Sequence, residues 1–277
     1  MKHGISISDM AKLHGLTRQT LLYYDKIGLF KPENVDDKGY RYYSWRQIPV
    51  LREICFLKAT GIPLKDIVGH FQNRTAHKEL ILLDNQKIVI EEEIGRLQRL
   101  RQALDMRIQT YRTADEAIRM HQDEPFLLNL PSRQVLYREY LKPVHKENLH
   151  RTLMELWKNV TPELGLPAGR FGTMILQEYA RTDHPIDGAG SCFFLPEWEQ
   201  RRPEAITLPA GEYACLFSYH MPYDMTAMQQ LLQWMDGQGL ELGGHVVDIC
   251  LLDTTFYTTA DSVDFCLLQA PVYHRNK

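Results

Sequence analysis

Hydrophobic positions near the start of the chain recur every three or four residues, which is the spacing of amphipathic helices. The segment from Ser6 to Asp9 has the form of a helix N-cap followed by an acid three residues on. Gly15 permits a sharp turn after this first helix, and Thr17 caps a second helix that Gly28 stops. Two short helices with such a turn predict either a DNA-reading helix-turn-helix or an ordinary helical hairpin.

The pattern then becomes short and extended. After Pro32, an acidic turn leads to Gly39 and the run Tyr40-Arg41-Tyr42-Tyr43, which predicts a two-stranded wing with a glycine-containing tip. Guanidinium and phenol groups donate hydrogen bonds to phosphate oxygens, so this run suits a DNA backbone. Because side chains alternate along a strand, some of these tyrosines are instead expected in the core.

Helical spacing returns after the wing. Ser44 and Gln47 form a capping box for a third helix, and a fourth follows from Leu64 to about Phe71. From about His77 to Met120 there is no proline, and apolar residues recur at alternating steps of three and four. A helix of some 40 residues spans about 60 Å, too long for one small domain. It predicts a dimerising coiled coil rather than a helix buried in a bundle.

The last part of the chain predicts strands with two helices. Strands are expected at 133–143, 172–179, 246–252 and 263–268, with a hairpin-like pair at 191–195 and 206–219. Amphipathic helices are expected at 147–157 and 225–235. Antiparallel strands with both helices on one face form an α+β domain, whose other face is available for a ligand.

Composition adds a division of charge to this picture. The chain of 277 residues has a net charge of -3, yet residues 1–75 carry twelve Lys and Arg against seven Asp and Glu. The remaining residues carry 20 against 28. A basic head joined to an acidic body suggests that the head faces DNA while the body has another task.

Several classes of protein are excluded by what the sequence lacks. No run of about 18 apolar residues and no signal peptide is present, so a cytoplasmic protein without membrane contact is expected. The five cysteines are dispersed without a C-x-x-C spacing, which favours buried free thiols over disulfides or zinc. No cofactor is expected.

The motifs of the head resemble a known family. The pattern T-x-x-T-L-x-Y-Y-D-x-I-G-L at 17–29 and G-Y-R-Y-Y at 39–43 resembles the MerR-family transcription regulators. The similarity covers residues 5 to about 120, including the antiparallel coiled coil of those dimers. In residues 206–214, I-x-L-P-A-G-E-Y-A looks like a GyrI-like effector-binding domain, typical of the multidrug-sensing, BmrR-like branch.

The resemblance implies a domain order and a mechanism. A winged helix-turn-helix domain is expected at 1–75, a dimerisation helix at 76–121 and a GyrI-like α+β domain at 122–277. A homodimer would bind double-stranded promoter DNA, and a bound effector would make it bend and untwist the spacer for RNA polymerase. Metal sensors of the family carry cysteines near the end of the coiled coil. This chain has none between Cys55 and Cys192, so no metal site is expected.

The head supplies the candidate DNA contacts. Polar residues at the start of the second helix can reach base edges, and the tyrosines and Arg41 match family positions that grip phosphates. Leu22 departs from the family, in which an arginine usually precedes the paired tyrosines. The predicted DNA-binding residues are Thr17, Arg18, Gln19, Thr20, Tyr23, Tyr24, Lys31, Tyr40, Arg41 and Tyr42.

The acid Asp248 is the candidate centre of an effector site. A carboxylate inside the apolar run 246–252 is costly to bury unless it is paired or functional, although a half-exposed strand would let it face water. Its position matches the acid with which the multidrug sensors meet a cation. Aromatic faces attract lipophilic cations, and the predicted walls, each of which also fits an ordinary core, are Trp157, Phe171, Tyr179, Phe217, Tyr219, Tyr223 and Phe265.

Two other functions remain open. A small-molecule hydrolase would need Asp248 with His245, or Glu178 as a base, but the sequence contains no G-x-S-x-G, H-E-x-x-H or phosphate-binding glycine loop. The sequence therefore predicts a protein that is not an enzyme. The third possibility is a DNA-bending repressor without a ligand, in which the last domain only stiffens the dimer.

Overall fold

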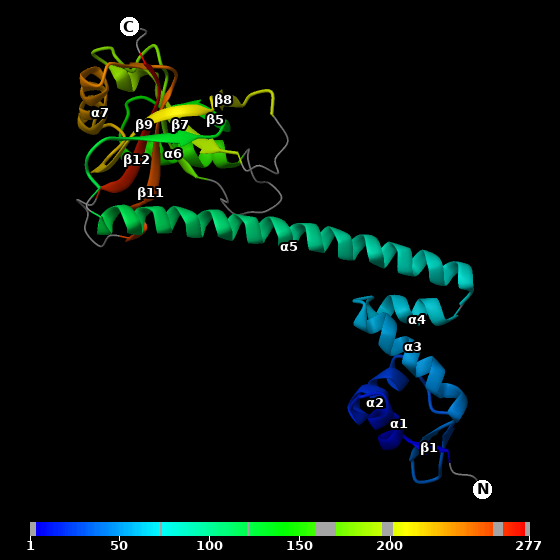
Figure 1. The fold of residues 1–277 in the computed structure, drawn as a ribbon. Helices are drawn as coiled ribbons and strands as arrows, with labels where there is room; N and C mark the ends of the chain where they lie inside the picture. Colours follow the sequence, from blue (N-terminus) through cyan, green and yellow to red (C-terminus); the bar gives the residue numbers. More distant parts are fainter. Residues whose placement is uncertain are drawn as a thin grey trace. The chain divides into compact units, whose positions relative to one another are not determined.

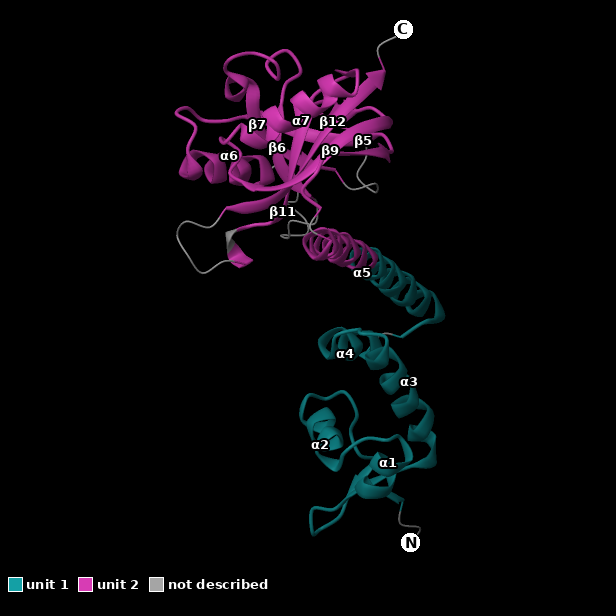
Figure 2. Cartoon of the chain, turned by 60° about the vertical axis from the view of Figure 1, so that its left-hand side comes forward, with its two compact units in different colours: residues 1–97 teal, residues 98–277 magenta. Residues whose placement is uncertain are grey.

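The computed structural model describes residues 4–72, 74–120, 122–158, 170–195, 202–256 and 263–274. The chain divides into two compact units, residues 1–97 and residues 98–277, whose boundary falls inside one long helix (Figure 2). Each unit has its own buried hydrophobic core. Figure 1 gives the order of the elements along the chain.

The first unit opens with the predicted helix-turn-helix, formed by α1 (Ile7–Leu13) and α2 (Arg18–Lys26). Both predicted caps are confirmed, because the hydroxyls of Ser6 and Thr17 each accept a hydrogen bond of 3.1 Å from the backbone N–H three residues on. Gly15 has a φ of 66°, a conformation that costs a glycine little. The turn between the two helices is therefore set by local chemistry.

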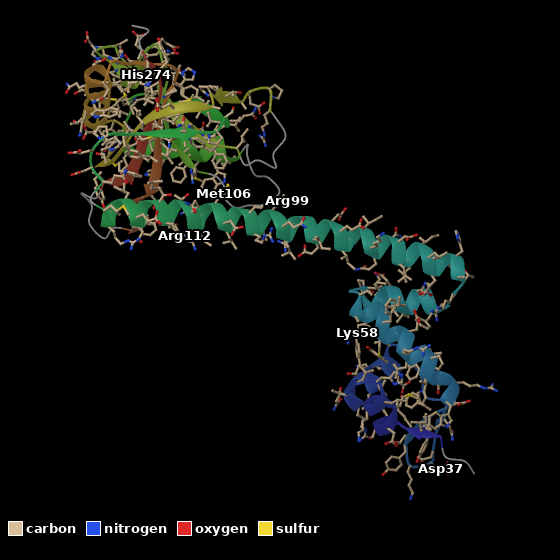
Figure 3. The ribbon with its side chains drawn as sticks, viewed as in Figure 1. Asp37, Lys58, Arg99, Met106, Arg112 and His274 are labelled. Atoms are coloured by element: carbon tan, nitrogen blue, oxygen red, sulfur yellow. The ribbon has the colours of Figure 1, made fainter. Side chains whose placement is uncertain are left out.

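The wing has one strand more than the sequence predicts. Strand β3 (Arg41–Tyr43) lies between β1 (Ile5–Ser6) and β2 (Asn34–Val35) in an antiparallel sheet. The carboxylate of Asp36 shapes the hairpin turn by accepting hydrogen bonds from the backbone N–H groups of Lys38 and Tyr40. Asp37 lies at the far end of this turn (Figure 3).

Two further helices, α3 (Ile48–Ala59) and α4 (Leu64–Gln72), complete the core of the first unit. The capping box of Ser44 and Gln47 is present, but it caps a 3₁₀ turn, η1 (Trp45–Gln47), which runs directly into α3. The proline at the second position of α3 is compatible with this entry, because the first turn of a helix has no partner for that N–H group.

The long helix is confirmed almost residue for residue: α5 spans Ala76–Arg119, 44 residues. Many of its apolar side chains are exposed, including those on the spacing of three and four that predicts a coiled coil. The exposed residues on this spacing, the apolar stripe of α5, are Ile90, Ile94, Leu97, Leu104, Ile108 and Ile118. Within the described parts of the chain, no helix has the length and apolarity needed to cross a membrane.

The second unit is built on an antiparallel sheet of nine strands with the order β4-β9-β12-β11-β6-β7-β5-β8, and β10 pairs with β12 at one end. Two helices, α6 (Lys146–Lys158) and α7 (Thr226–Gly237), and two 3₁₀ turns, η2 (Pro185–Gly188) and η3 (Thr254–Phe256), accompany it. The strands are β4 (Phe126–Leu130), β5 (Arg133–Glu139), β6 (Phe171–Ile175), β7 (Ala189–Phe194), β8 (Ile206–Leu208), β9 (Gly211–His220), β10 (Leu240–Leu242), β11 (Val246–Leu252) and β12 (Asp264–His274).

The predicted hairpin in this unit is wrong. Residues 206–219 form two strands, β8 and β9, because the run is interrupted at Pro209 and Ala210, and proline has no N–H group for a strand hydrogen bond. Strands β7 and β8 do not pair with each other but lie on opposite sides of β5. Strand β6 is also shorter than expected, since a turn replaces its second half after Ile175. Strands β4 and β10 were not predicted from the sequence.

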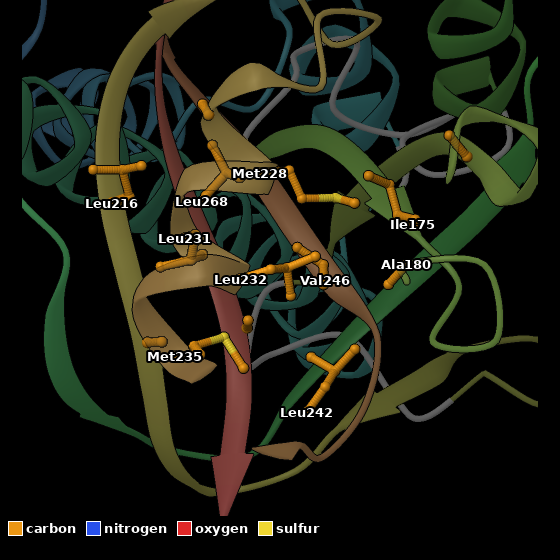
Figure 4. Packing of buried hydrophobic residues seen from close by; sticks show 14 of the residues in the cluster. Ile175, Ala180, Leu216, Met228, Leu231, Leu232, Met235, Leu242, Val246 and Leu268 are labelled. Atoms are coloured by element: carbon orange, nitrogen blue, oxygen red, sulfur yellow. The ribbon is translucent and has the colours of Figure 1, made fainter. Parts of the chain in front are cut away.

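The two helices pack on the same face of the sheet. Apolar residues of α7 and Leu149 of α6 share one cluster with Ile175, Val246 and Leu268 of the strands (Figure 4). The opposite face holds a second cluster, to which the end of α5 contributes Ala114 and Ala117. Alternating residues of each strand therefore enter different cores.

Candidate functional site

The wing and the second helix of the head enclose a groove of about 130 Å³. Arg18 of α2 and Tyr40, Arg41 and Tyr42 of the wing line it, together with Leu22. The N-terminal turn of α1 contributes Ser6, Ile7 and Ser8 on the other side. Four of the predicted DNA contacts are thus brought together from segments about 20 residues apart. Leu22, which departs from the family, lies among them.

Hydrogen bonds orient the polar groups of this groove. The Nε of Arg41 donates to Asp25 at 2.8 Å, which leaves its two terminal nitrogens available for phosphate oxygens. The hydroxyl of Tyr42 donates to Asp36 at 3.4 Å. Partial burial and this carboxylate raise the pKa of Tyr42, so the phenol stays a neutral donor. The terminal nitrogens of Arg41 therefore remain as donors for an anion, whereas the O–H group of Tyr42 is used by Asp36.

The other predicted DNA residues differ in exposure. Gln19 and Lys31 are exposed, as is Tyr23 on the outer face of α2. The hydroxyls of Thr17 and Thr20 are hydrogen-bonded to each other at 2.9 Å at the start of α2. Tyr24 is different, because it is only 1% exposed and its hydroxyl is buried. The structure places Tyr24 in the core of the head, out of reach of a phosphate, because α2 turns this side inward.

A cavity of about 220 Å³ lies between α6 and the sheet of the second unit. The helix contributes an apolar wall of Leu149, Leu153, Met154 and Trp157, and Phe171 of β6 extends it. Asp248 lies at the opposite, polar side. Three of the predicted effector residues therefore share this cavity: Trp157, Phe171 and Asp248. The cavity lies on the helix-covered face of the sheet, not on the other face as predicted.

The polar side of the cavity is built by strand register. Ser191 of β7 is paired with Thr173 of β6, and Thr173 is paired with Asp248 of β11. All three are at least nine-tenths buried. The hydroxyl of Tyr140 closes the row by a hydrogen bond of 2.5 Å with Thr173. Direct cross-strand pairing thus aligns polar groups that the sequence separates by tens of residues.

Asp248 is not a lone carboxylate. Its Oδ2 accepts a hydrogen bond of 2.9 Å from Nε2 of His220 at the end of β9, and both side chains are buried. Burial by itself would lower the pKa of His220, but the charge of Asp248 and the hydrogen bond to it outweigh that effect and raise the pKa. The other oxygen, Oδ1, is buried without a hydrogen-bond partner.

Cys266 of β12 lies beside this pair. Donor atoms of His220, Asp248 and Cys266 fall within 4.8 Å of one another, so these three residues could hold a metal ion. The hydrogen bond with Cys250, burial and the charge of Asp248 raise the pKa of the Cys266 thiol well above its ordinary value. A protonated thiol is a poor nucleophile, which disfavours cysteine catalysis at this position.

The residues proposed for hydrolysis do not assemble. His245 accepts a hydrogen bond of 3.0 Å from the backbone N–H of Gln177, outside the residues that line the cavity. Glu178 is exposed in the turn that follows β6. Asp248 is paired with His220 instead, so the predicted pair of Asp248 with His245 is not formed.

The remaining predicted walls lie elsewhere. Phe217, Tyr219 and Phe265 line a second cavity, of about 510 Å³, with Ala117 and Ile118 of α5. Their rings are stacked or tilted against one another, with centroids 5.8 Å and 4.7 Å apart. These residues alternate with those that face Asp248, because neighbouring positions of a strand point to opposite faces. Tyr179 and Tyr223 line neither cavity.

Some candidate residues were missed by sequence reasoning. Asp264 lines the cavity of Asp248, is 7% exposed and has an Oδ1 atom without a hydrogen-bond partner. Burial and the charge of Asp253 raise its pKa. Like Asp248, Asp264 is an acid next to an apolar run, and this sequence pattern could have identified it as a candidate. Trp45, which is 75% exposed beside the wing, was also overlooked.

The head matches a known protein family. Residues 5–74 match the family described as MerR HTH family regulatory protein. The Multidrug-efflux transporter 2 regulator of Bacillus subtilis (strain 168) is 31% identical over 150 residues, covering 52% of this chain and 55% of that regulator. The Multidrug-efflux transporter 1 regulator of the same strain is 25% identical over 257 residues, covering 89% and 90%.

The chain thus spans about half the length of the first of these relatives and most of the second. A solved cryo-EM structure described as the EcmrR-DNA complex in EcmrR-RPo aligns with 98% of this chain and 100% of that chain. Its sequence identity is 18% and its TM-score is 0.37. The family match includes the groove of Arg18 and the wing, whereas the cavity of Asp248 lies outside the matched residues.

Proposed function

We propose that this chain, whose residues 5–74 belong to the MerR helix-turn-helix family, is a transcription regulator that binds promoter DNA as a homodimer and responds to a small molecule. The proposal rests on the groove that Arg18, Tyr40, Arg41 and Tyr42 line together. We assign DNA binding to residues 1–75, dimerisation to residues 76–121 and effector binding to residues 122–277.

The head suits a grip on the DNA backbone. The wing presents Arg41, held by Asp25, and the exposed ring of Tyr40 next to the start of α2. Contacts of this kind position a protein on the duplex, while the first residues of α2 approach base edges. Gln19 is exposed there and can hydrogen-bond a base, whereas Thr17 and Thr20 also hold the helix start.

Dimerisation is supported by the apolar stripe of α5. Ile94, Leu97 and Leu104 are each about half exposed or more, at the spacing by which two helices interlock. A second copy of the chain would remove this surface from water. Two heads on one dimer would then contact two half-sites of the promoter.

Effector control is the role proposed for the second unit. The names of the two Bacillus subtilis relatives describe regulators of multidrug-efflux transporters. The cavity of Asp248 combines an apolar wall with buried carboxylates, which suits a lipophilic cation. We propose that the bound effector changes how the dimer holds DNA, so that the spacer is bent and untwisted for RNA polymerase.

Selection from a pool of random double-stranded DNA tests the proposal. The wild-type chain is expected to select an inverted repeat, because a two-fold dimer presents two identical heads. Transcription from a promoter with this repeat in its spacer should then rise when a lipophilic cation is added. Recovery of single half-sites would contradict the dimer, and transcription that cations leave unchanged would contradict effector control.

A further inference from the structure

The cavity of Asp248 is lined by more carboxylates than one monovalent cation needs for charge balance. Asp248, Asp253 and Asp264 line it, against one arginine, Arg107. Arg107 is exposed at the cavity rim, where its Nε donates a hydrogen bond of 2.7 Å to the hydroxyl of Tyr111. Among the described residues, His220, His150 and Lys146 are further basic groups near these acids. The carboxylates therefore differ in how far their charge is compensated.

Asp248 and Asp264 are in different electrostatic situations. His220 donates a hydrogen bond of 2.9 Å to Asp248, so this carboxylate has a basic partner. Asp264 makes no such ion pair among the described residues, although His150 lines the same cavity. A cation that enters the cavity therefore meets a carboxylate without an ion-pair partner at Asp264.

Each of the two acids also has one carboxylate oxygen without a hydrogen bond. Oδ1 of Asp248 and Oδ1 of Asp264 are buried without partners, in side chains that are 6% and 7% exposed. Buried acceptors without donors are unfavourable, and a hydrogen bond from a charged donor is the strongest way to satisfy them. A quaternary ammonium group has no N–H, so it would balance charge while leaving both oxygens unsatisfied.

We propose that this cavity selects amphiphilic cations that carry N–H donors, such as protonated amines or amidines, over quaternary ammonium ions, and that Asp264 is the acid that binds their charge. Asp248, oriented by His220, serves as the second acceptor. The wall of Leu149, Leu153, Met154 and Trp157 receives the apolar part of the ligand. The volume of about 220 Å³ favours a compact ligand with one ring over a large dye.

The inference rests on the proposed effector role of the second unit and narrows its ligand class. Two compounds with the same apolar body form a suitable probe pair: 4-phenylbutylamine and its N,N,N-trimethyl derivative. Isothermal titration of the full chain, with a chelator present to keep metal ions off Cys266 and His220, should give at least about tenfold tighter binding of the amine. This factor is what one lost hydrogen bond to a charged group produces.

Variants locate the binding site. Asp264→Asn should weaken amine binding at least about tenfold, because it removes the carboxylate that has no ion-pair partner. The matched control is Asp123→Asn, an acid that lines the second cavity with Phe217 and Tyr219. It should leave binding within about twofold of wild type. Thermal unfolding of Asp264→Asn should be no lower than that of wild type, since the variant removes a buried charge that has no ion-pair partner.

The outcomes distinguish a failure of the proposed amine site from a failure of the proposed effector role. Equal affinity for the two compounds, with Asp264→Asn weakening both, would overturn the preference for N–H donors and leave the effector role standing. Weakening by Asp123→Asn instead of Asp264→Asn would assign the ligand to the second cavity and overturn the role of Asp264. If neither compound binds the wild-type chain, the amine site is wrong, whereas the proposed effector role fails only if transcription is also unchanged by lipophilic cations.

Discussion

Asp248 shows how a partner from a distant strand changes what a residue can do. In the sequence it is a single acid in an apolar run, which indicates either a ligand contact or a solvent-facing position. In the structure, His220 donates to it and one oxygen is left unpartnered. The pair is a structural element as well as a candidate ligand site, so its two roles can be tested separately.

The first residue-scale prediction concerns stability. His220→Leu leaves Asp248 buried without its partner, which should lower the free energy of unfolding by about 3–5 kcal/mol at pH 6. Because the pKa of His220 is raised by folding, the stabilisation is complete below the unfolded pKa of about 6.5. It is lost as pH rises through the folded pKa. The difference between wild type and variant should therefore be smaller at pH 9.

Urea unfolding followed by circular dichroism at the two pH values measures this difference. The double variant His220→Leu and Asp248→Leu is the control, because it replaces the pair by apolar side chains and should recover much of the loss. A single variant as stable as wild type at pH 6 would show that the pair contributes nothing.

Tyr24 illustrates the limit of transferring roles by motif. The paired tyrosines Tyr23 and Tyr24 match a phosphate-gripping pattern, yet adjacent residues of a helix point about 100° apart. Tyr23 is exposed and Tyr24 is buried beneath Lys58, whose Nζ lies 6.0 Å from the centre of its ring. Only the packing of α2 distinguishes the two.

Among the elements, the strands separate residues that the sequence suggests belong together. Tyr219 and His220 are neighbours in β9, but one lines the second cavity and the other contacts Asp248. The same alternation separates Phe265 from Asp264 in β12. The aromatic cage predicted from the sequence therefore combines residues that lie on two different faces of one sheet.

Close packing between β6 and β11 gives the element-scale prediction. A Cβ atom at Gly172 would lie 1.9 Å from the backbone oxygen of Asp248, which no side-chain movement can relieve. Gly172→Ala should lower stability by roughly 1–3 kcal/mol or more, because the two strands must separate. It should also weaken amine binding by moving Asp248.

Gly237→Ala is the matched control for this change. Its added Cβ meets nothing within 4 Å at the end of α7, so stability should stay equal or rise by roughly 0.5–1 kcal/mol. The midpoints of urea unfolding of both variants provide the comparison. A Gly172→Ala protein with wild-type stability would contradict the close approach of the two strands.

For the whole molecule, the charge division of the chain leads to a prediction about the proposed binding of DNA. The excess of Lys and Arg in residues 1–75 opposes the acidic remainder, so binding should depend strongly on salt. Arg41→Ala should weaken binding to all sequences and reduce the slope of affinity against salt by about one unit for each arginine lost. A homodimer would therefore lose about two units.

Fluorescence anisotropy over a range of salt concentrations measures the slope. Because Asp25 accepts the hydrogen bond of Arg41, Arg41→Ala also leaves an unpaired acid near the DNA. The double variant with Asp25→Ala separates the two effects, since it removes the acid as well as the arginine. A loss of affinity confined to one DNA sequence would contradict a phosphate contact.

Local signals in the order of amino acids were sufficient to predict the head and the long helix. Caps at Ser6 and Thr17, the positive-φ glycines and the periodicity of α5 act within a few residues, so they can be read without knowing the rest of the chain. The charge division and the family motifs are likewise properties of the sequence. Strand pairing, by contrast, was read incorrectly between β7 and β8.

Tertiary structure was needed for everything that depends on contacts between distant strands. The pairing of His220 with Asp248, the register of Ser191 with Thr173, and the entry of Asp264 into the same cavity follow from sheet order and side-chain alternation. A shift of one residue in any strand would turn these side chains to the other face. Spacing along the sequence carries no such information, which is why the cavity emerged only from the fold.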